Sequence, residues 1–325
     1  MAGHPQPSRR ARELVRGAYD VHLHVGPDVM KRRIDDFTVA QRFASVGLDG
    51  FVLKSHYMPT AERAAVVRHA HGAHALGAVT LNASVGGLNP LAVEIAARSG
   101  AKFVWFPTVD SRNQRESRAT EPEGATPPMW AQIQDELSAA GMAADPVDVV
   151  DSDGALLDAA RQVLRLIARH DMVLATGHLH TDEILAVIEA ASAEGVRRMV
   201  VTHPEFTSQR VGVGRQREMA ARGALMERCL TTPYTGKVEW DVWFHNIREV
   251  GPEHSVVSSD LGQPFNPPVE DGLALCADYL LGAGFSDDEV RLMTVHNSRW
   301  LVGAKPLETQ PVNEGEAHPA MDEGA

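Results

Sequence analysis

Two histidines lie one residue apart near the N-terminus, within the run YDVHLH at residues 19–24. The apolar residues of this run predict a β-strand, and alternation along a strand places Asp20, His22 and His24 on one face. Two imidazoles that point the same way from the end of a strand can bind one metal ion. On a helix the same spacing would turn them about 200° apart. The pair therefore indicates a metal site.

A second pair with the same spacing, His69 and His71, has His74 nearby but falls at the end of a predicted helix, residues 61–73. A cationic side chain is favourable near a helix C-terminus. We therefore interpret these histidines as exposed surface residues.

Three later apolar runs end in residue types that bind metals. His178 follows residues 173–177, His203 follows residues 200–202, and Asp260 follows residues 256–259. One such residue alone is more often a satisfied polar group at a strand end. Together with His22 and His24 they predict one shared site, because the C-terminal ends of barrel strands meet at one mouth.

The elements that would position these residues alternate along the chain. Short runs rich in β-branched residues are predicted as strands at residues 18–23, 49–54, 78–83, 102–107, 172–176, 197–202, 224–230 and 255–259. Amphipathic helical patterns lie between them. This alternation favours a (β/α)8 TIM barrel, with a doubly wound open sheet as the alternative fold.

The barrel is expected to span residues 18–304, after an N-terminal extension (residues 1–17) and before a C-terminal tail (residues 305–325). An insertion after the fourth strand, at about residues 109–153, carries a helical pattern near residues 130–140. It could be a substrate lid, a subunit contact or a surface excursion without a catalytic role. Residues 1–10 and 305–325 lack periodicity and are expected to be disordered.

From residue 20 to about residue 303, the sequence resembles the amidohydrolase superfamily of metal-dependent hydrolases. The run at residues 258–260 and the closing helix at residues 296–301 look like the C-terminal end of that family. The resemblance rests on the following residues: His22, His24, His178, His203 and Asp260. It implies a reaction class and no particular substrate.

Many binuclear members of that family carry a bridging carboxylated lysine or glutamate at the end of the fourth strand, where residues 105–108 here read WFPT. The sequence is therefore more similar to the mononuclear members, which favours one ion over two. Lys54 and His56 share a face after the second strand. Lys54 is expected to be a carboxylated bridging ligand, a cationic anchor for a substrate carboxylate, or part of an ordinary ion pair. His56 is a candidate ligand or proton carrier at the substrate site.

Glu227 on the seventh strand shares a face with Cys229, and a buried carboxylate needs a partner. That partner could be Lys54, the substrate or a structural salt bridge, whereas Cys229 is expected to belong to the core. Asn82 on the third strand is expected to bind substrate. Arg112, with Arg115, could hold a substrate carboxylate. Residues 212–214 (GVG) lack the third glycine of a dinucleotide-binding fingerprint.

The resemblance also implies roles for these residues. Asp260 would take a proton from the attacking water, whose pKa a divalent metal ion lowers toward ~7. His203 would bind a second ion or polarise the scissile carbonyl. Asp20 would orient a liganding imidazole. Zn²⁺ is the first choice, and Mn²⁺, Fe²⁺ or Co²⁺ also suit these ligands. The expected ligands are His22, His24, His178 and Asp260.

The predicted reaction is hydrolysis of an amide, cyclic amide or lactone bond in a small molecule that carries a carboxylate. One alternative is a mononuclear, metal-dependent, non-oxidative decarboxylase of the same superfamily, which released carbon dioxide would reveal. Another alternative is a metal-binding barrel without catalytic activity.

The chain carries 31 basic and 43 acidic residues, a net charge of −12, which argues against a nucleic-acid partner. Two cysteines cannot form a disulfide framework, and neither a signal-peptide core nor a run of eighteen apolar residues is present. We therefore expect a cytoplasmic protein without a membrane partner. A homo-oligomer, most simply a dimer, is expected because such assemblies are common.

Overall fold

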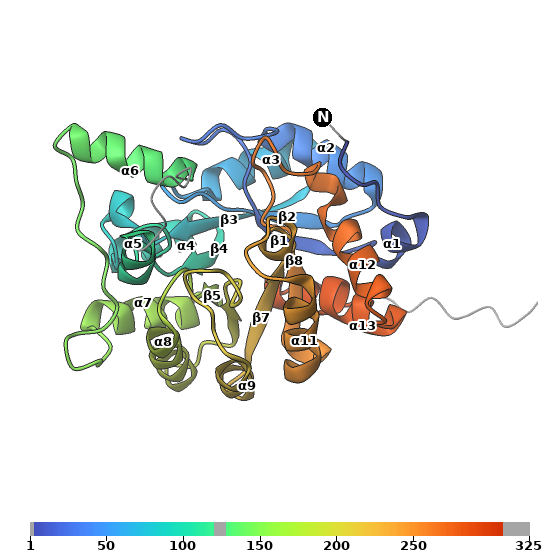
Figure 1. Cartoon of the computed structure of the whole chain (residues 1–325). Helices are drawn as coiled ribbons and strands as arrows, with labels where there is room; N and C mark the ends of the chain where they lie inside the picture. The colour runs from blue at the N-terminus through green and yellow to red at the C-terminus, as the bar shows by residue number, and fades with distance from the viewer. Residues whose placement is uncertain (1–2, 120–127, 308–325) are drawn as a thin grey trace, which may run out of the picture.

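The computed structural model describes residues 3–119 and 128–307. In this part of the chain a parallel eight-stranded sheet runs in sequence order, and helices surround it (Figure 1). The last strand meets the first, since Leu23 bridges Leu261 in parallel. The fold is the predicted (β/α)8 TIM barrel, and the doubly wound alternative is wrong.

The strands are β1 (Tyr19–Leu23), β2 (Gly50–Leu53), β3 (His74–Thr80), β4 (Ala101–Trp105), β5 (Val173–Ala175), β6 (Arg198–Val201), β7 (Ala224–Cys229) and β8 (Ser255–Ser258). Most lie within a residue or two of their predicted bounds. The clearest difference is β3, which begins four residues earlier than predicted, at His74, and ends before Asn82.

The α-helices are α1 (Arg9–Leu14), α2 (Asp36–Val46), α3 (Ala61–His71), α4 (Pro90–Arg98), α5 (Arg112–Ala119), α6 (Met129–Ala139), α7 (Asp158–Arg169), α8 (Thr181–Ala193), α9 (Val213–Ala221), α10 (Thr231–Tyr234), α11 (Trp240–Val250), α12 (Gly272–Gly282), α13 (Asp287–Arg291) and α14 (Asn297–Val302). Short 3₁₀ turns are η1 (Ala83–Val85), η2 (Pro252–His254) and η3 (Val269–Asp271), and the π-helical turn η4 (Leu292–His296) precedes α14.

Local signals explain where helices begin and end. The Asp35 side chain accepts a hydrogen bond from the Thr38 N–H and caps α2, which ends at Gly47 with a left-handed φ of 78°. Asn89 caps α4, which has proline in its first turn. Such caps fix the lengths of the helices that pack around the sheet.

Alternate strand residues divide the apolar core into two layers. The barrel interior contains Val52, Phe103, Val173, Val200 and Val256, and Leu301 of α14 packs against them. Residues next to them along the strands, such as Leu53 and Val104, pack outward against the helices. An inward residue near a strand's C-terminal end is thereby placed at the barrel mouth.

A β-bulge interrupts the expected alternation in β1. Asp20 pairs with Phe51 and Leu23 with Leu53, so one extra residue is accommodated in β1. Val21 therefore joins the inner layer, while Leu23 packs with the outer layer. The prediction that Asp20 shares a face with His22 and His24 is wrong, because the bulge changes the alternation between them.

Helices α5 and α6 lie between β4 and β5, with α6 at the outer edge of the molecule (Figure 1). Helix α6 matches the predicted helical pattern, whereas α5 was not predicted. Part of the predicted insertion, residues 120–127, lies outside the described residues.

The N-terminal stretch differs from the expectation of disorder. Ser8 caps α1 through its side chain, and Asp278 accepts hydrogen bonds from its N–H and hydroxyl at 2.6 Å each. Of the predicted C-terminal tail, residues 308–325 lie outside the described residues. No helix in the described ranges has both the length and the apolar character needed to cross a membrane.

Candidate metal centre

Most of the predicted site residues converge at the C-terminal ends of the strands; Arg112 and Asp20 are the exceptions. His22 lies in β1, and the converging residues follow a strand end or, for Glu227, lie late in β7. The buried members are His22, His24, Lys54, His56, His178, His203 and Glu227. Asp260 follows β8, and its side chain is 15% exposed.

His22, His24 and Asp260 form the tightest group of candidate ligands. Asp260 Oδ1 lies 3.1 Å from His22 Nε2 and 3.2 Å from His24 Nε2. One ligand atom from each residue lies within 4.8 Å of the others. Two imidazoles and a carboxylate suit zinc and neighbouring transition metals.

Glu227 orients the imidazole of His22. Its Oε1 lies 3.0 Å from His22 Nδ1, and the carboxylate can only accept, so Nδ1 carries the proton. Nε2 then faces Asp260 with its lone pair available when the ring is neutral. Metal-bound histidines usually have such a carboxylate partner on the other ring nitrogen.

Lys54 Nζ lies 2.8 Å from the same Nε2 atom of His22 and 5.2 Å from the centre of the Trp105 ring. Burial lowers the pKa of Lys54. Burial and Lys54 also oppose protonation of His22, but the Asp260 and Glu227 carboxylates outweigh them and raise its pKa to about 9. Only one hydrogen fits between Nζ and Nε2 at this distance, so the two groups compete for a proton.

His24 has a partner that the sequence did not reveal. Arg32 approaches His24 Nδ1 at 3.3 Å through one terminal nitrogen, which also lies 2.5 Å from Asp28. The side chains of Arg32 and Asp28 are 2% and 1% exposed. Burial, and secondly the charge of Arg32, lower the pKa of His24 well below its usual value. Neither residue stood out in the sequence, because a charged pair on a loop is ordinarily solvated.

Asp260 is held in a left-handed backbone conformation, with a φ of 53°. Its N–H donates to the His22 carbonyl at 2.9 Å, and its Oδ2 accepts a 2.9 Å hydrogen bond from the Thr231 hydroxyl. Although burial opposes ionisation, His22 and His24 hold the pKa of Asp260 well below its usual range. The carboxylate is therefore ionised and fixed in place.

His178 and His203 form the adjoining wall of the site, with ring centres 4.9 Å apart. Burial lowers the pKa of His203 to about 4 and that of His178 well below its usual value, so both are neutral at pH 7. His178 Nδ1 is buried and finds no hydrogen-bond partner among the described residues. His178 is not part of the three-residue group around Asp260.

His56 packs against this wall, and its ring centre lies 5.0 Å from that of His24 and 6.2 Å from that of His178. Its Nδ1 lies 2.9 Å from the Thr108 hydroxyl. Burial lowers the pKa of His56 well below its usual value. His56 is therefore a neutral imidazole within the predicted site.

Asn82, predicted to bind substrate, makes hydrogen bonds that connect neighbouring loops. Its amide nitrogen donates to the His56 carbonyl at 2.9 Å and to the Thr108 hydroxyl at 2.7 Å. Its oxygen accepts from the N–H groups of Thr108 and Asp110. These four hydrogen bonds join the loops after β2, β3 and β4, and they occupy the side-chain polar atoms.

Arg112 and Arg115 are paired elsewhere. Arg112 binds both oxygens of Asp148, at 2.5 and 2.7 Å, with about half of its side chain exposed. Arg115 donates to Asp110 at 2.7 Å. The prediction that Arg112 holds substrate is not supported, because helix α5 places it in an ion pair with its own insertion.

Asp20 contacts backbone instead of an imidazole. Its Oδ1 accepts from the N–H groups of Ser259 and His22 at 3.0 and 3.3 Å. The carboxylate that orients the His22 imidazole is Glu227, and Asp20 makes no hydrogen bond to an imidazole among the described residues.

Cys229 lies near the same imidazole, with its sulfur 3.8 Å from His22 Nδ1 and 3.2 Å from the Ser258 hydroxyl. His22, Glu227 and Cys229 form a second group of possible ligands. Burial and then the Glu227 charge raise the pKa of the Cys229 thiol well above its usual value. A neutral thiol is a poor ligand, which agrees with the expectation of a core residue.

The second histidine pair lies in the last turn of α3, as predicted. His69 and His71 are exposed, and the His71 ring packs 5.1 Å from that of Phe37.

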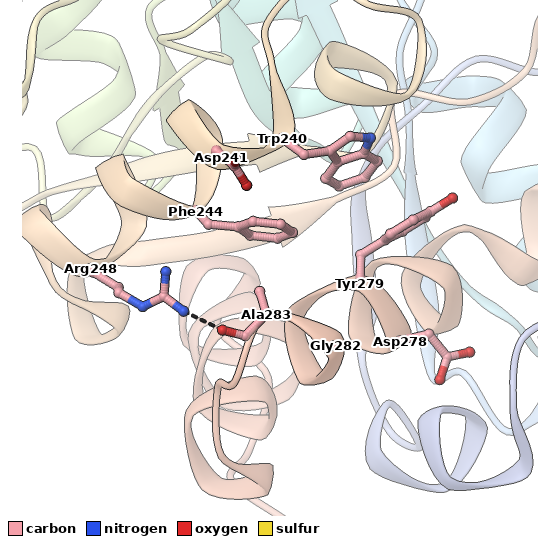
Figure 2. A pocket seen from close by; sticks show the side chains of 8 residues that line it. All are labelled: Trp240, Asp241, Phe244, Arg248, Asp278, Tyr279, Gly282 and Ala283. Atoms are coloured by element: carbon pink, nitrogen blue, oxygen red, sulfur yellow. Dashed lines mark hydrogen bonds between the residues drawn. The ribbon is translucent and has the colours of Figure 1, made fainter.

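A groove of about 590 Å³ between α11 and α12 is lined by Trp240, Phe244 and Tyr279 (Figure 2). Its lining contains no member of the histidine cluster, so the groove is separate from the candidate metal centre.

The donor set fits a divalent transition-metal ion. Glu227 fixes the orientation of His22, Asp260 is ionised, and the buried Nδ1 of His178 lacks a partner among the described residues. A metal ion at His22 Nε2 would have to displace the proton that the raised pKa of this ring favours. Once that proton is displaced, a bound cation would compensate the charges of the Glu227 and Asp260 carboxylates.

A parallel barrel with histidines and an aspartate at its C-terminal mouth defines a class of (β/α)8 proteins with a candidate metal site. The fold is shared with solved structures of an amidohydrolase from Pseudomonas aeruginosa and a TatD homolog from Escherichia coli. The amidohydrolase matches with a TM-score of 0.56 and 12% identity over 90% of this chain and 98% of that chain. The TatD homolog matches with a TM-score of 0.55 and 13% identity over 90% of this chain and 100% of that chain.

A mutant organophosphorus hydrolase from Deinococcus radiodurans matches with a TM-score of 0.53 and 16% identity over 93% of this chain and 99% of that chain. The predicted resemblance is thereby confirmed for the fold. The chain belongs to DUF6282, a family of unknown function, whose model matches residues 17–227. A search of curated protein sequences finds no match.

Proposed function

We propose that this protein is a metal-dependent hydrolase with its active site at the barrel mouth. The observation that carries the proposal is the group formed by His22, His24 and Asp260, with Glu227 fixing the His22 imidazole. A scaffold barrel has no need to bury such a group, because each buried charge costs free energy unless it is compensated. We also propose one ion per chain, with zinc as the first choice.

When bound, a divalent cation would activate water and polarise the bond to be broken. Asp260 would accept the proton of the attacking water and return it to the leaving group. Its carboxylate is ionised, and the Thr231 hydroxyl hydrogen-bonds only Oδ2. His22 and His24 would hold the ion, with His178 as the predicted further ligand and His203 as another candidate. The neutral state of His178 supports that role.

The substrate would be a small molecule with an amide, cyclic amide or lactone bond. Two buried cations, Lys54 and Arg32, lie beside the histidines and support an anionic group on that molecule. Arg32 replaces Arg112 in this proposal. Lys54 would act as the cationic anchor once a metal ion at His22 Nε2 releases it, or as a carboxylated ligand if two ions bind. The proposal further includes a cytoplasmic homodimer.

The test compares wild type with Asp260→Asn and with Asp241→Asn, a matched change on the exposed face of α11. Each protein is loaded with zinc or manganese and screened with lactones, cyclic amides and N-acyl amino acids. Carbon dioxide release is recorded in parallel. We expect wild type and Asp241→Asn to hydrolyse the same compound. The rate of Asp260→Asn should be lower by a factor of about 10² to 10⁴, because the proton acceptor is gone.

Equal rates for Asp260→Asn and wild type would contradict the proposal. So would carbon dioxide release without hydrolysis, which would instead establish a decarboxylase. A wild-type protein that binds metal but turns over none of these compounds would leave only the non-catalytic barrel.

A further inference from the structure

Gln209 is a buried glutamine in the loop that follows β6, and its side chain contacts the imidazole of His203. Oε1 of Gln209 lies 2.8 Å from His203 Nδ1. Nε2 of Gln209 donates to the Gly177 carbonyl at 2.8 Å and to the Thr202 carbonyl at 2.9 Å. The glutamine thus joins the ends of β5 and β6, where His178 and His203 begin their loops.

The two carbonyl contacts determine which way the amide points. A carbonyl oxygen can only accept, so the NH₂ group must face Gly177 and Thr202. The amide oxygen must then face His203, and an oxygen accepts its hydrogen bond from an N–H. His203 therefore carries its proton on Nδ1, and its Nε2 bears a lone pair when the ring is neutral.

We propose that Gln209 is a positioning residue that locks His203 in the Nδ1–H tautomer. The nitrogen left free, Nε2, can bind a metal ion or accept a proton but cannot donate a hydrogen bond. His203 consequently cannot stabilise an oxyanion as a neutral donor. Two roles were predicted for His203. Binding an ion through a lone pair remains, and polarising the scissile carbonyl as a hydrogen-bond donor does not.

The backbone supports such a lock. His203 has a φ of 25°, in the left-handed region that a residue with a side chain seldom adopts. The loop is closed on itself, because the N–H of Phe206 donates to the His203 carbonyl and the N–H of Val211 donates to the Pro204 carbonyl, at 2.9 and 2.8 Å. A strained residue persists only where its surroundings hold it, and Gln209 supplies part of that support.

The tautomer itself follows from the hydrogen bonds, whereas its use in binding metal rests on the proposed function. Two measurements keep these apart. Two-bond ¹H–¹⁵N correlation spectra of the metal-free protein with ¹⁵N-labelled histidine report which ring nitrogen carries the proton. Competition with a chromogenic chelator reports zinc affinity. A His203→Gln spectrum identifies the His203 signals.

The variants are Gln209→Met, which keeps the volume and removes the acceptor, and Gln209→Glu, which keeps an acceptor oxygen. Gln134→Met is the matched control, because Gln134 is also buried and donates to the Val109 carbonyl and to Asp110. We expect Nδ1–H at His203 in wild type, Gln209→Glu and Gln134→Met, and a mixture of tautomers in Gln209→Met. Zinc should bind about 10- to 100-fold more weakly to Gln209→Met than to wild type.

An Nε2–H tautomer in wild type, or an unchanged tautomer in Gln209→Met, would overturn the proposal. If Gln209→Met fails to fold, the spectra of wild type and Gln209→Glu decide, and loss of Nδ1–H in Gln209→Glu would also overturn it. If wild type shows the lock but binds no zinc, the proposed function fails and the assignment of Gln209 stands.

Discussion

The histidines of β1 differ in what holds their second ring nitrogen. His22 donates to a carboxylate, Glu227, whereas His24 meets a guanidinium, Arg32. A carboxylate leaves Nε2 ready to bind a cation, but an arginine that donates to Nδ1 favours a proton on Nε2. Metal binding to His24 therefore requires the contact with Arg32 to loosen, which would free this arginine for an anionic substrate.

Asp20 shows a separate consequence of burial at the residue scale. Burial raises its pKa from 3.8 to about 6, despite backbone hydrogen bonds that oppose the shift. The folded state then binds more protons than the unfolded state between about pH 4 and 6, so Asp20 makes stability fall as pH rises through this window.

We predict that Asp20→Asn flattens this fall and stabilises the metal-free protein at pH 7 by roughly 1 to 2 kcal/mol. The amide oxygen can still accept from the backbone N–H groups of His22 and Ser259. Urea unfolding between pH 4.5 and 7.5 measures the effect, with Asp241→Asn as the control. If the unfolding free energy of Asp20→Asn fell with pH as steeply as that of wild type, ionisation of Asp20 would not destabilise the folded protein.

At the scale of elements, the sequence predicted which runs form strands and helices, because apolar periodicity depends on neighbouring residues. It did not predict the bulge in β1, which depends on how β1 pairs with β2. The early start of β3 was missed because His74 and Gly77 interrupt the apolar pattern. Ligand candidates at strand ends were found by type. Their partners were missed because Arg32 and Gln209 lie on loops without periodicity and Thr231 begins the short helix α10.

A buried ion pair behind β7 was also beyond the reach of the sequence pattern. Arg228 points outward from β7 and binds Glu205, and both side chains are at most 2% exposed. Gln216 of α9 and Asn246 of α11 complete the cluster, with contacts of 2.9 Å to Arg228 and 3.2 Å to Glu205 respectively. The cluster joins the loop after β6 to two outer helices.

Removing one charge of this pair should cost more than removing both. We predict that Arg228→Met alone destabilises the protein by about 3 to 5 kcal/mol, because Glu205 is left buried without its counter-charge. Adding Glu205→Leu should recover at least about half of that loss. Denaturant unfolding of both single variants and the double variant gives the coupling, and additive effects would show that the pair does not act as a unit.

At the scale of the whole molecule, the candidate metal centre lies on the seam where the barrel closes. The N–H of Asp260 donates to the His22 carbonyl, and the N–H of His24 donates to the Leu261 carbonyl, both at 2.9 Å. The first and last strands thus bring their candidate ligands together only when the sheet closes. A bound ion would stabilise the closed barrel, since it binds the folded state alone.

The central claim is that these residues bind a metal ion, and elemental analysis of protein purified without an affinity tag tests it most directly. The comparison includes wild type, His22→Asn, and His69→Asn as a control on the exposed end of α3. We predict about one ion per chain in wild type and His69→Asn and almost none in His22→Asn. Wild type without metal even after addition of zinc or manganese, or equal content in all three proteins, would contradict the account.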